Sequence, residues 1–331
     1  MIEQPALESN QNQSIRLSRI FNAQKITLIG VIIAIFIFFA IFAPNFLTTR
    51  NLMFVILKIS TIIIVATGAT LLMITGNFDL SVGSVVAFTG IIYAYMAKHG
   101  IPIYMAVVLA IAWGMFFGYL NGLAVARLKI TPVIATLATM YIARGFAFLI
   151  ARWDGGANIS AGLPRDFSSF GRTMIGPIPL LTIIMIVLVA VFIFIERKTV
   201  FGRFIFAMGS NPDAARVSGI NVPSIITWLY VITGALAGLC GVFQTSRIGM
   251  GSPQNFKGFE FDVLIALILG GTSLKGGEGS ISGMVLGALI VGVIGNGLNL
   301  MNVSSYYQLV FNGAILVMAV VTYQSLGKKM L

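Results

Sequence analysis

The chain has 331 residues, of which 58% are hydrophobic and only 9% are charged, and its mean hydropathy is +0.97. This composition excludes a soluble globular protein and predicts a polytopic membrane protein. A net charge of +11 would suggest nucleic-acid binding in a soluble protein, but here it fits basic side chains that face anionic lipid headgroups. One cysteine and one histidine exclude a disulfide framework and a Cys/His metal site, and no cofactor is expected.

The apolar runs predict an all-α transmembrane helical bundle of about ten spans. A span needs roughly 20 apolar residues, and the connections between the runs are short. We expect residues 1–25 to be a cytoplasmic N-terminal tail and residues 26–331 to form one transmembrane domain. The predicted spans are 26–43, 52–75, about 76–96, 103–126, 132–150, 180–195, 225–245, 259–269, 281–299 and 306–323.

The lysines and arginines predict the orientation of this bundle. With the N-terminus inside, twelve of the 21 fall in segments expected to be cytoplasmic and seven in segments expected to be external. The remaining two, Lys58 and Arg144, lie within spans. Because basic residues concentrate on the cytoplasmic side, the bias favours both termini inside the cell.

The third apolar run opens on a polar, glycine-bearing stretch, 76–84, which reads GNFDLSVGS. In a helix, Asn77, Ser81 and Ser84 would share one face. Asp79 has two interpretations: it caps the helix of the third span, or it lines a transport pathway together with those three residues.

A second acidic opening, 259–262, begins a run of only eleven residues that ends in a glycine-rich turn. We therefore expect a short or broken helix at 259–269, and inverted halves that each contain an interrupted helix. Matching interruptions of this kind mark a transport site near the membrane centre.

Two further features lie inside predicted spans. Gly114, Gly118 and Gly122 stand four residues apart and predict a stripe along which another helix packs closely. Arg144 should face protein or water, either as a structural partner of a backbone carbonyl or carboxylate or as a functional group.

The longest basic interruption, 196–222, is expected to be a cytoplasmic loop. Asn211 and Pro212 favour a helix start, with Asp213 in the first turn, and Gly219 favours a stop after Ser218. So short a helix needs support from another surface, which we take to be a cytoplasmic partner. Small residues at Ala214, Ala215 and Ser218 would enter a cleft of that partner, while Asp213 and Arg216 make contacts at its rim.

The sequence contains no recognisable enzyme site. Lys275 in the glycine-rich turn is followed by Gly276, so there is no P-loop. The lone histidine, His99, lies beside Gly100 and Pro102 and is expected to be incidental. A transporter that uses ATP would have to obtain it from a partner.

Four ordered motifs between about residues 45 and 323 resemble the permease subunits of bacterial ABC importers of the ribose, xylose and galactose type. The first is the stretch 76–84. The second joins 199–203 (TVFGR) to 211–220 (NPDAARVSGI), and includes Gly202 and Arg203. The others are LGGTSL at 269–274 with its following glycines, and NGLN at 296–299 with SSYYQ at 304–308.

This resemblance implies a membrane-spanning subunit that carries a monosaccharide or similar polyol across the bacterial inner membrane. It also implies a second permease copy or paralogue, cytoplasmic ATP-binding subunits and a periplasmic sugar-binding protein. The 196–222 loop would then couple the permease to the ATPase. The alternative is a self-sufficient secondary transporter or channel, for which Asp79 is the one candidate ion-coupling carboxylate.

Overall fold

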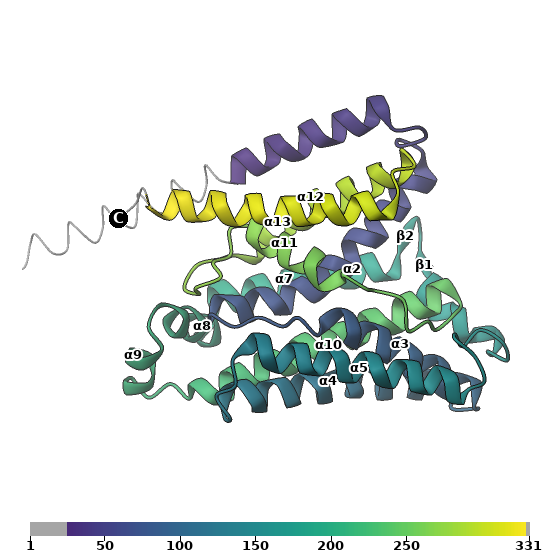
Figure 1. Ribbon diagram of the computed structural model, residues 1–331, viewed down its shortest axis with the longest axis horizontal. Helices are drawn as coiled ribbons and strands as arrows, with labels where there is room; N and C mark the ends of the chain where they lie inside the picture. The colour runs from purple at the N-terminus through teal and green to yellow at the C-terminus, as the bar shows by residue number, and fades with distance from the viewer. Residues whose placement is uncertain (1–24, 329–331) are drawn as a thin grey trace, which may run out of the picture.

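The computed structural model describes residues 25–328 and is almost entirely α-helical (Figure 1). The predicted N-terminal tail lies outside the described residues, apart from Lys25. An N-terminal helix, Lys25–Phe42, precedes the labelled elements. These are α2 (Thr49–Ile74), α3 (Val82–Lys98), α4 (Ile103–Ala126), α5 (Pro132–Trp153), η1 (Arg165–Ser168), α6 (Ser169–Arg172), α7 (Leu180–Lys198), α8 (Val200–Ser210), α9 (Pro212–Val217), α10 (Val222–Ile248), α11 (Phe259–Leu269), α12 (Ile281–Leu300) and α13 (Ser305–Lys328). The strands β1 (Met174–Ile175) and β2 (Ile178–Pro179) form one antiparallel hairpin.

Within residues 25–328, seven helices are long and apolar enough to cross a membrane. α3 has 17 residues and α11 has 11, so each falls short of that length. The prediction of an all-α polytopic bundle is confirmed, whereas the number of about ten spans stays a prediction.

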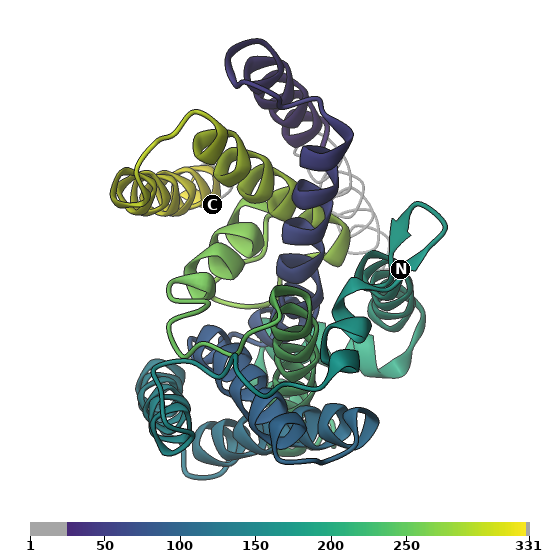
Figure 2. The ribbon, with the colours of Figure 1, turned by 90° about the vertical axis from the view of Figure 1, so that its right-hand side faces the viewer.

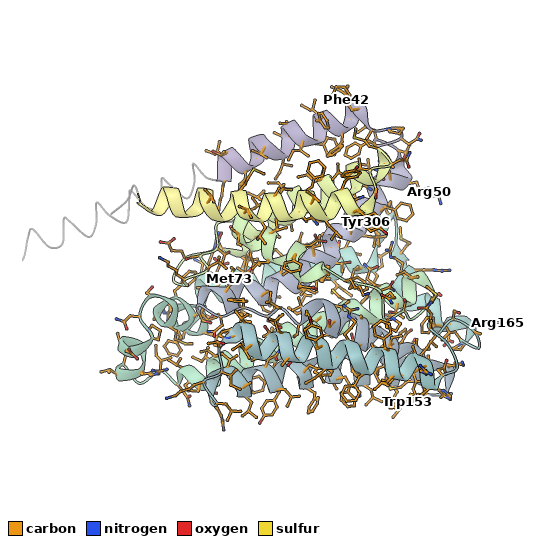
Figure 3. The ribbon with its side chains drawn as sticks, in the orientation of Figure 1. Phe42, Arg50, Met73, Trp153, Arg165 and Tyr306 are labelled. Carbon is orange, nitrogen blue, oxygen red and sulfur yellow. The ribbon has the colours of Figure 1, made fainter. Side chains whose placement is uncertain are left out.

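The long helices run side by side, so that the bundle has two ends (Figure 1). One end carries α8 and α9, together with the start of the N-terminal helix and the end of α13; we call it the α8–α9 end. The opposite end carries the β1–β2 hairpin and is called the hairpin end. Large apolar side chains such as Phe42, Trp153 and Tyr306 project from the outside of the bundle, while Met73 is buried within it (Figure 3).

The glycine stripe of α4 packs directly against α10. A Cβ atom on Gly114 or Gly118 would overlap the backbone of Gly234 or Tyr230, and one on Gly122 would lie 2.7 Å from the Cα of Thr227. These obstacles are backbone atoms, which cannot turn aside as a flexible side chain can. The predicted packing stripe is confirmed, and its partner is α10.

Two pairs of successive helices, α2 with α3 and α10 with α11, are each joined by a non-helical segment within the bundle. The chain leaves α2 at Ile74, runs without helix through 75–81, and then forms α3. It leaves α10 at Ile248, runs without helix through 249–258, and then forms α11. The start of α3 contacts the start of α11, because a Cβ on Gly83 would collide with the Glu260 carboxylate and the Phe256 carbonyl.

The packing around the interruptions repeats as well. α4 packs on α10 as α12 packs on α2, and α3 packs on α5 as α11 packs on α13. Seen from the hairpin end, α5 and α13 flank α11 on the same side of the molecule (Figure 2).

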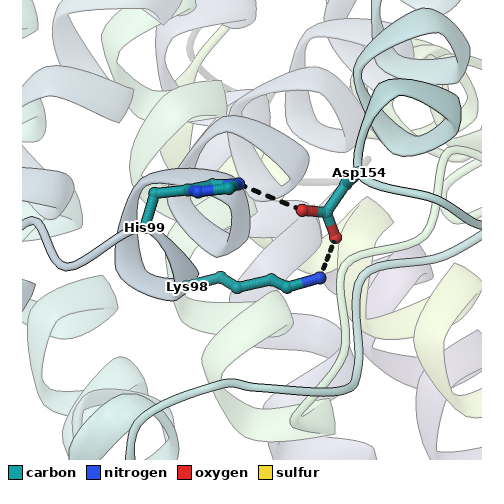
Figure 4. A network of polar contacts seen from close by, with 3 residues as sticks. All are labelled: Lys98, His99 and Asp154. Carbon is teal, nitrogen blue, oxygen red and sulfur yellow. Dashed lines mark hydrogen bonds and ion pairs between the residues drawn. The ribbon is translucent and has the colours of Figure 1, made fainter.

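At the hairpin end, a polar cluster joins α3 to the end of α5 (Figure 4). Asp154 caps α5 and receives the Lys98 ammonium at 2.6 Å and the His99 ring nitrogen at 3.1 Å. His99 therefore takes part in a structural contact. Its partner could not be predicted from the sequence, because Asp154 lies far from it along the chain. The cluster fixes the relative position of the two helix ends.

Candidate functional site

Asp79 lies in the non-helical segment 75–81 and is enclosed by polar partners. Its Oδ1 accepts hydrogen bonds from the backbone N–H of Ser81 at 2.8 Å and from the Ser81 hydroxyl at 2.6 Å. Asn121 of α4 donates to both carboxylate oxygens at 3.4 Å, and its own amide oxygen accepts from the Thr139 hydroxyl of α5 at 2.6 Å. The carboxylate thus ties the turn before α3 to α4, and through Asn121 to α5. The N-cap of α3 is Ser81, whose side chain makes no cap hydrogen bond, so the interpretation of Asp79 as the helix cap is wrong.

The expectation that Asn77, Ser81 and Ser84 share a helical face is wrong. α3 begins only at Val82, so Asn77 and Ser81 precede it on extended and turn backbone. The side-chain amide of Asn77 donates to the Thr75 carbonyl at 3.2 Å, which favours a turn over a continued helix. Ser84 alone of the three is helical.

Arg144 connects this region to the second interruption. Its Nε donates to the Ser84 hydroxyl at 3.1 Å, and its Nη1 donates to the carbonyls of Pro253 and Asn255 at 2.6 and 2.7 Å. Arg144 is therefore a partner of backbone carbonyls, one of the two roles expected for it. Next to it, the Oε2 atom of Glu260 is buried and has no hydrogen-bond partner among residues 25–328.

The short helix of the basic loop is α9, Pro212–Val217, and its caps are those predicted. The Asn211 side chain accepts from the N–H groups of Asp213 and Ala214 at 3.1 and 3.0 Å. Gly219 has a φ of +83°, so the helix ends where the sequence predicts. On the exposed side, the Arg216 guanidinium pairs with Asp213 at 3.0 Å.

The docking face expected for α9 is wrong in one residue. Ala215 is 4% exposed and packs with Met208 and Val222 of this same chain, so it cannot enter a partner's cleft. Ala214, Arg216 and Ser218 remain exposed, and Val217 is 91% exposed. Val217 is an exposed apolar side chain that sequence reasoning missed, because a six-residue helix does not reveal which side faces the rest of the protein.

Helix α8 was also missed by sequence reasoning. The Thr199 hydroxyl caps this helix by accepting from the N–H of Gly202 at 3.2 Å, and Gly202, Ile205 and Met208 form its buried side. The sequence signal for this helix was a threonine at its start, followed by small or apolar residues at every third position. Gly202 lies against the carbonyls of Ile195 and Glu196 at the end of α7, while Arg203 is exposed.

α8 contacts the end of α2, directly before the segment that contains Asp79. Gly209 of α8 lies directly against the Ile74 carbonyl at the end of α2, and the N–H of Gly277, in the glycine-rich turn, donates to that same carbonyl at 2.8 Å. Asn77 and Arg216 line one cavity of about 420 Å³ together with residues of α4 and α10. One predicted pathway residue and one predicted coupling residue are therefore neighbours.

The four predicted pathway residues divide among three neighbourhoods. Asp79 and Ser81 belong to the cluster with Asn121 and Thr139, and Ser84 belongs to the Arg144 contact. Asn77 lies nearer the α8–α9 end, at the cavity it shares with Arg216.

A multi-pass bundle with two interrupted helices, one of them contacting a helical loop at its end, has the architecture of a transport permease. The profile of the family described as "Branched-chain amino acid transport system / permease component" matches residues 51–320. The chain belongs to this family of transport permease components, and it is a multi-pass protein of the inner (plasma) membrane.

Permeases that are named for a transported sugar align with most of the chain. The ribose import permease protein RbsC of Haemophilus influenzae is 34% identical over 325 residues, which are 97% of this chain and 99% of the relative. The ribose import permease protein RbsC of Escherichia coli is 37% identical over 283 residues, 84% of this chain and 87% of the relative. The L-arabinose transport system permease protein AraH of Escherichia coli is 37% identical over 295 residues, 89% and 88% of the two chains.

Proposed function

We propose that this chain is the membrane-spanning subunit of an ATP-driven importer for a monosaccharide, with a pentose as the substrate class. The observation that carries the proposal is the full-length similarity to permeases named for ribose and L-arabinose import. Its working partners would be a second permease copy, ATP-binding subunits and a sugar-binding protein outside the membrane. These partners are the ones that a permease component of such a system requires.

The α8–α9 end faces the cytoplasm in this proposal. It holds the basic loop, and the described ends of the chain lie at the same end of the bundle (Figure 1). A cytoplasmic α8–α9 end agrees with the excess of lysine and arginine in the segments expected to be cytoplasmic. The repeated packing of α2 to α5 and of α10 to α13 supports two inverted halves related across the membrane plane.

The ATP-binding subunit docks on α9 through the exposed side chain of Val217. Burying a valine contributes about 1.5–3 kcal/mol, whereas the exposed Asp213–Arg216 pair contributes about 1 kcal/mol or less at the rim. Motion of α9 would then change the cavity that its Arg216 lines together with Asn77 of segment 75–81. It also reaches the end of α2 through the contact of α8 with Ile74.

The experiment is transport by proteoliposomes that contain this chain with an ATP-binding subunit and a sugar-binding protein of the same importer. We expect ATP-dependent uptake of labelled ribose or L-arabinose, and no uptake without ATP. Uptake of these sugars that is independent of ATP would favour the alternative of a secondary transporter or channel. A complex that takes up neither sugar would contradict the proposed substrate class.

The docking residue is tested in the same vesicles. Val217→Asp should leave the protein folded, because the side chain is exposed, but should abolish stimulation of ATP hydrolysis by sugar-loaded binding protein. Val217→Thr keeps the shape of the side chain and serves as the matched control. Full stimulation in Val217→Asp would mean that α9 does not dock through this residue. Ala215→Trp should instead lower the amount of folded protein, because Ala215 is buried against Met208 and Val222.

The family description supports a second candidate substrate, a branched-chain amino acid. The sugar is preferred because the three relatives described above are named for pentoses. Leucine uptake by the same proteoliposomes, measured beside ribose and L-arabinose, separates the two candidates.

A further inference from the structure

Segment 249–258, which lies between the predicted spans 225–245 and 259–269, reaches the middle of a candidate span. Arg144, which holds the carbonyls of Pro253 and Asn255, lies 12 residues from Pro132 and 9 from Trp153 in α5. At about 1.5 Å per residue it is roughly 18 Å and 14 Å from the two helix ends. The loop therefore turns into α11 at mid-span depth, as the trace of the chain also indicates (Figure 1).

Two polar side chains of this segment, Gln254 and Lys257, are exposed on the outside of the chain. Neither side chain makes a hydrogen bond or ion pair with any residue in the described range 25–328. A lysine side chain is roughly 6 Å long, given five bonds of about 1.5 Å. It cannot bring its ammonium from this depth to a headgroup region more than ten ångströms away, as lysines near helix ends can.

An ammonium at this depth would be unfavourable against lipid, since intramembrane charges face protein or a water-filled cavity. Gln254 and Lys257 lie in the segment that leads directly into α11, the helix flanked by α5 and α13 (Figure 2). We infer that the surface that carries these two side chains borders water rather than hydrocarbon. The loop backbone itself supports this, because irregular backbone at membrane depth persists only where it is buried in protein or lines a water-filled cavity.

Resting on the proposed function, we propose that Gln254 and Lys257 contact the hydroxyl groups of the sugar as it passes the centre of the membrane. The Gln254 amide supplies a donor and an acceptor, and the Lys257 ammonium supplies three donors. The hydroxyl groups of a neutral sugar can accept from these donors and donate to the amide oxygen, so the sugar needs no negative charge. Contacts of this kind are favourable enough to admit a solute and weak enough to release it.

The first test measures water access and does not depend on transport. In a Cys240→Ala background, Lys257→Cys and Val187→Cys are labelled in membrane vesicles with a small cationic methanethiosulfonate. Val187 is an exposed apolar residue in the middle of α7 and is the matched control for lipid contact. Because only the thiolate reacts, and it forms in water, residue 257 should react at least about tenfold faster. Equal, slow reaction at both positions would overturn the inference that this surface borders water.

The second test measures the contact with sugar in the full reconstituted complex. Lys257→Met and Gln254→Leu should each reduce ribose or L-arabinose uptake by about tenfold, the effect of losing one good hydrogen bond. ATP hydrolysis stimulated by the binding protein should persist, and Lys257→Arg should restore uptake. Arg50→Met, which removes an exposed cation at the start of α2, is the control and should transport normally.

The outcomes separate this inference from the function on which it rests. Normal uptake in both Lys257→Met and Gln254→Leu would overturn the contact with sugar while leaving the permease assignment intact. Loss of uptake together with loss of folded protein in Lys257→Met would point to a structural role and would also overturn it. If the wild-type complex imports neither sugar, the proposed function fails and the sugar contact fails with it. The cysteine labelling would still report whether the segment faces water.

Discussion

Substitution of Gly118 tests the close packing of α4 on α10. A Cβ built at this position would lie 2.8 Å from the carbonyl carbon of Tyr230 and 3.0 Å from the Cα of Val231. Ordinary contact begins at 3.4 Å, and the Tyr230 carbonyl oxygen lies closer still than the carbonyl carbon. The two helices must therefore separate by more than 3.4 − 2.8 = 0.6 Å to accept even alanine. Leucine adds three more carbons to a seam with no space for them. Overpacking of this kind costs about 1–3 kcal/mol.

At about 2–4 °C per kcal/mol for a large domain, we expect Gly118→Leu to lower the melting temperature by about 2–12 °C. Gly118→Ala should lower it less, because alanine gains about 1 kcal/mol of helix propensity over glycine. The protein contains its own reporter for this measurement. Cys240, the single cysteine, is 0% exposed in α10, so a thiol-reactive dye should label it only when the bundle opens.

The matched control is Gly30→Leu. Gly30 lies in the N-terminal helix, and a Cβ atom placed on it would have nothing within 4 Å, so a larger side chain meets open space there. We expect its melting temperature to stay at or above that of the wild type. If Gly118→Leu melts at the wild-type temperature and is recovered in normal yield, backbone contact does not make glycine necessary in this seam.

Two further predictions concern the interrupted helices. Asp79→Asn keeps the oxygen that accepts from Ser81 and should transport nearly normally. Asp79→Ala leaves the buried Ser81 N–H without a partner, at a cost of about 1–3 kcal/mol, and should reduce folded protein and uptake. Equal, normal uptake in both variants would show that the carboxylate is unimportant. Arg144→Met should insert into the membrane but lose transport, because segment 253–256 loses the donors that hold its carbonyls. Arg144→Lys should recover only part of the activity, since an ammonium lacks the planar fork of donors of a guanidinium. In a Cys240→Ala background, a small thiol reagent should label a cysteine placed at residue 255 faster in Arg144→Met than with Arg144 present, and unchanged labelling would contradict the positioning role.

Features governed by neighbours along the chain could be predicted from the sequence. The caps of α9 depend on Asn211, Pro212 and Gly219 alone, because these residues set backbone angles and hydrogen bonds within a few positions. The glycine stripe of α4 was visible from its spacing, since a helix places every fourth residue on one side. The membrane class followed from composition, and the transport family followed from four ordered motifs.

Features decided by partners distant in the sequence required the tertiary structure. Nothing near Ala215 indicates that it packs on Met208 and Val222 while Val217 points outward. Nor does the local pattern around 75–81 reveal that Asp79 binds Asn121, some 40 residues away, in place of continuing a helix.

The depth of segment 249–258 is the clearest case. Its sequence is that of a polar loop, and a polar loop is normally expected in water outside the membrane. Arg144, more than 100 residues earlier, supplies the hydrogen bonds that allow irregular backbone to lie at mid-span. The sequence by itself determined which segments are apolar, capped or tightly packed, because those properties are local. Only the tertiary structure decided where the polar segments lie, since buried backbone groups must be satisfied and their partners can come from anywhere in the chain.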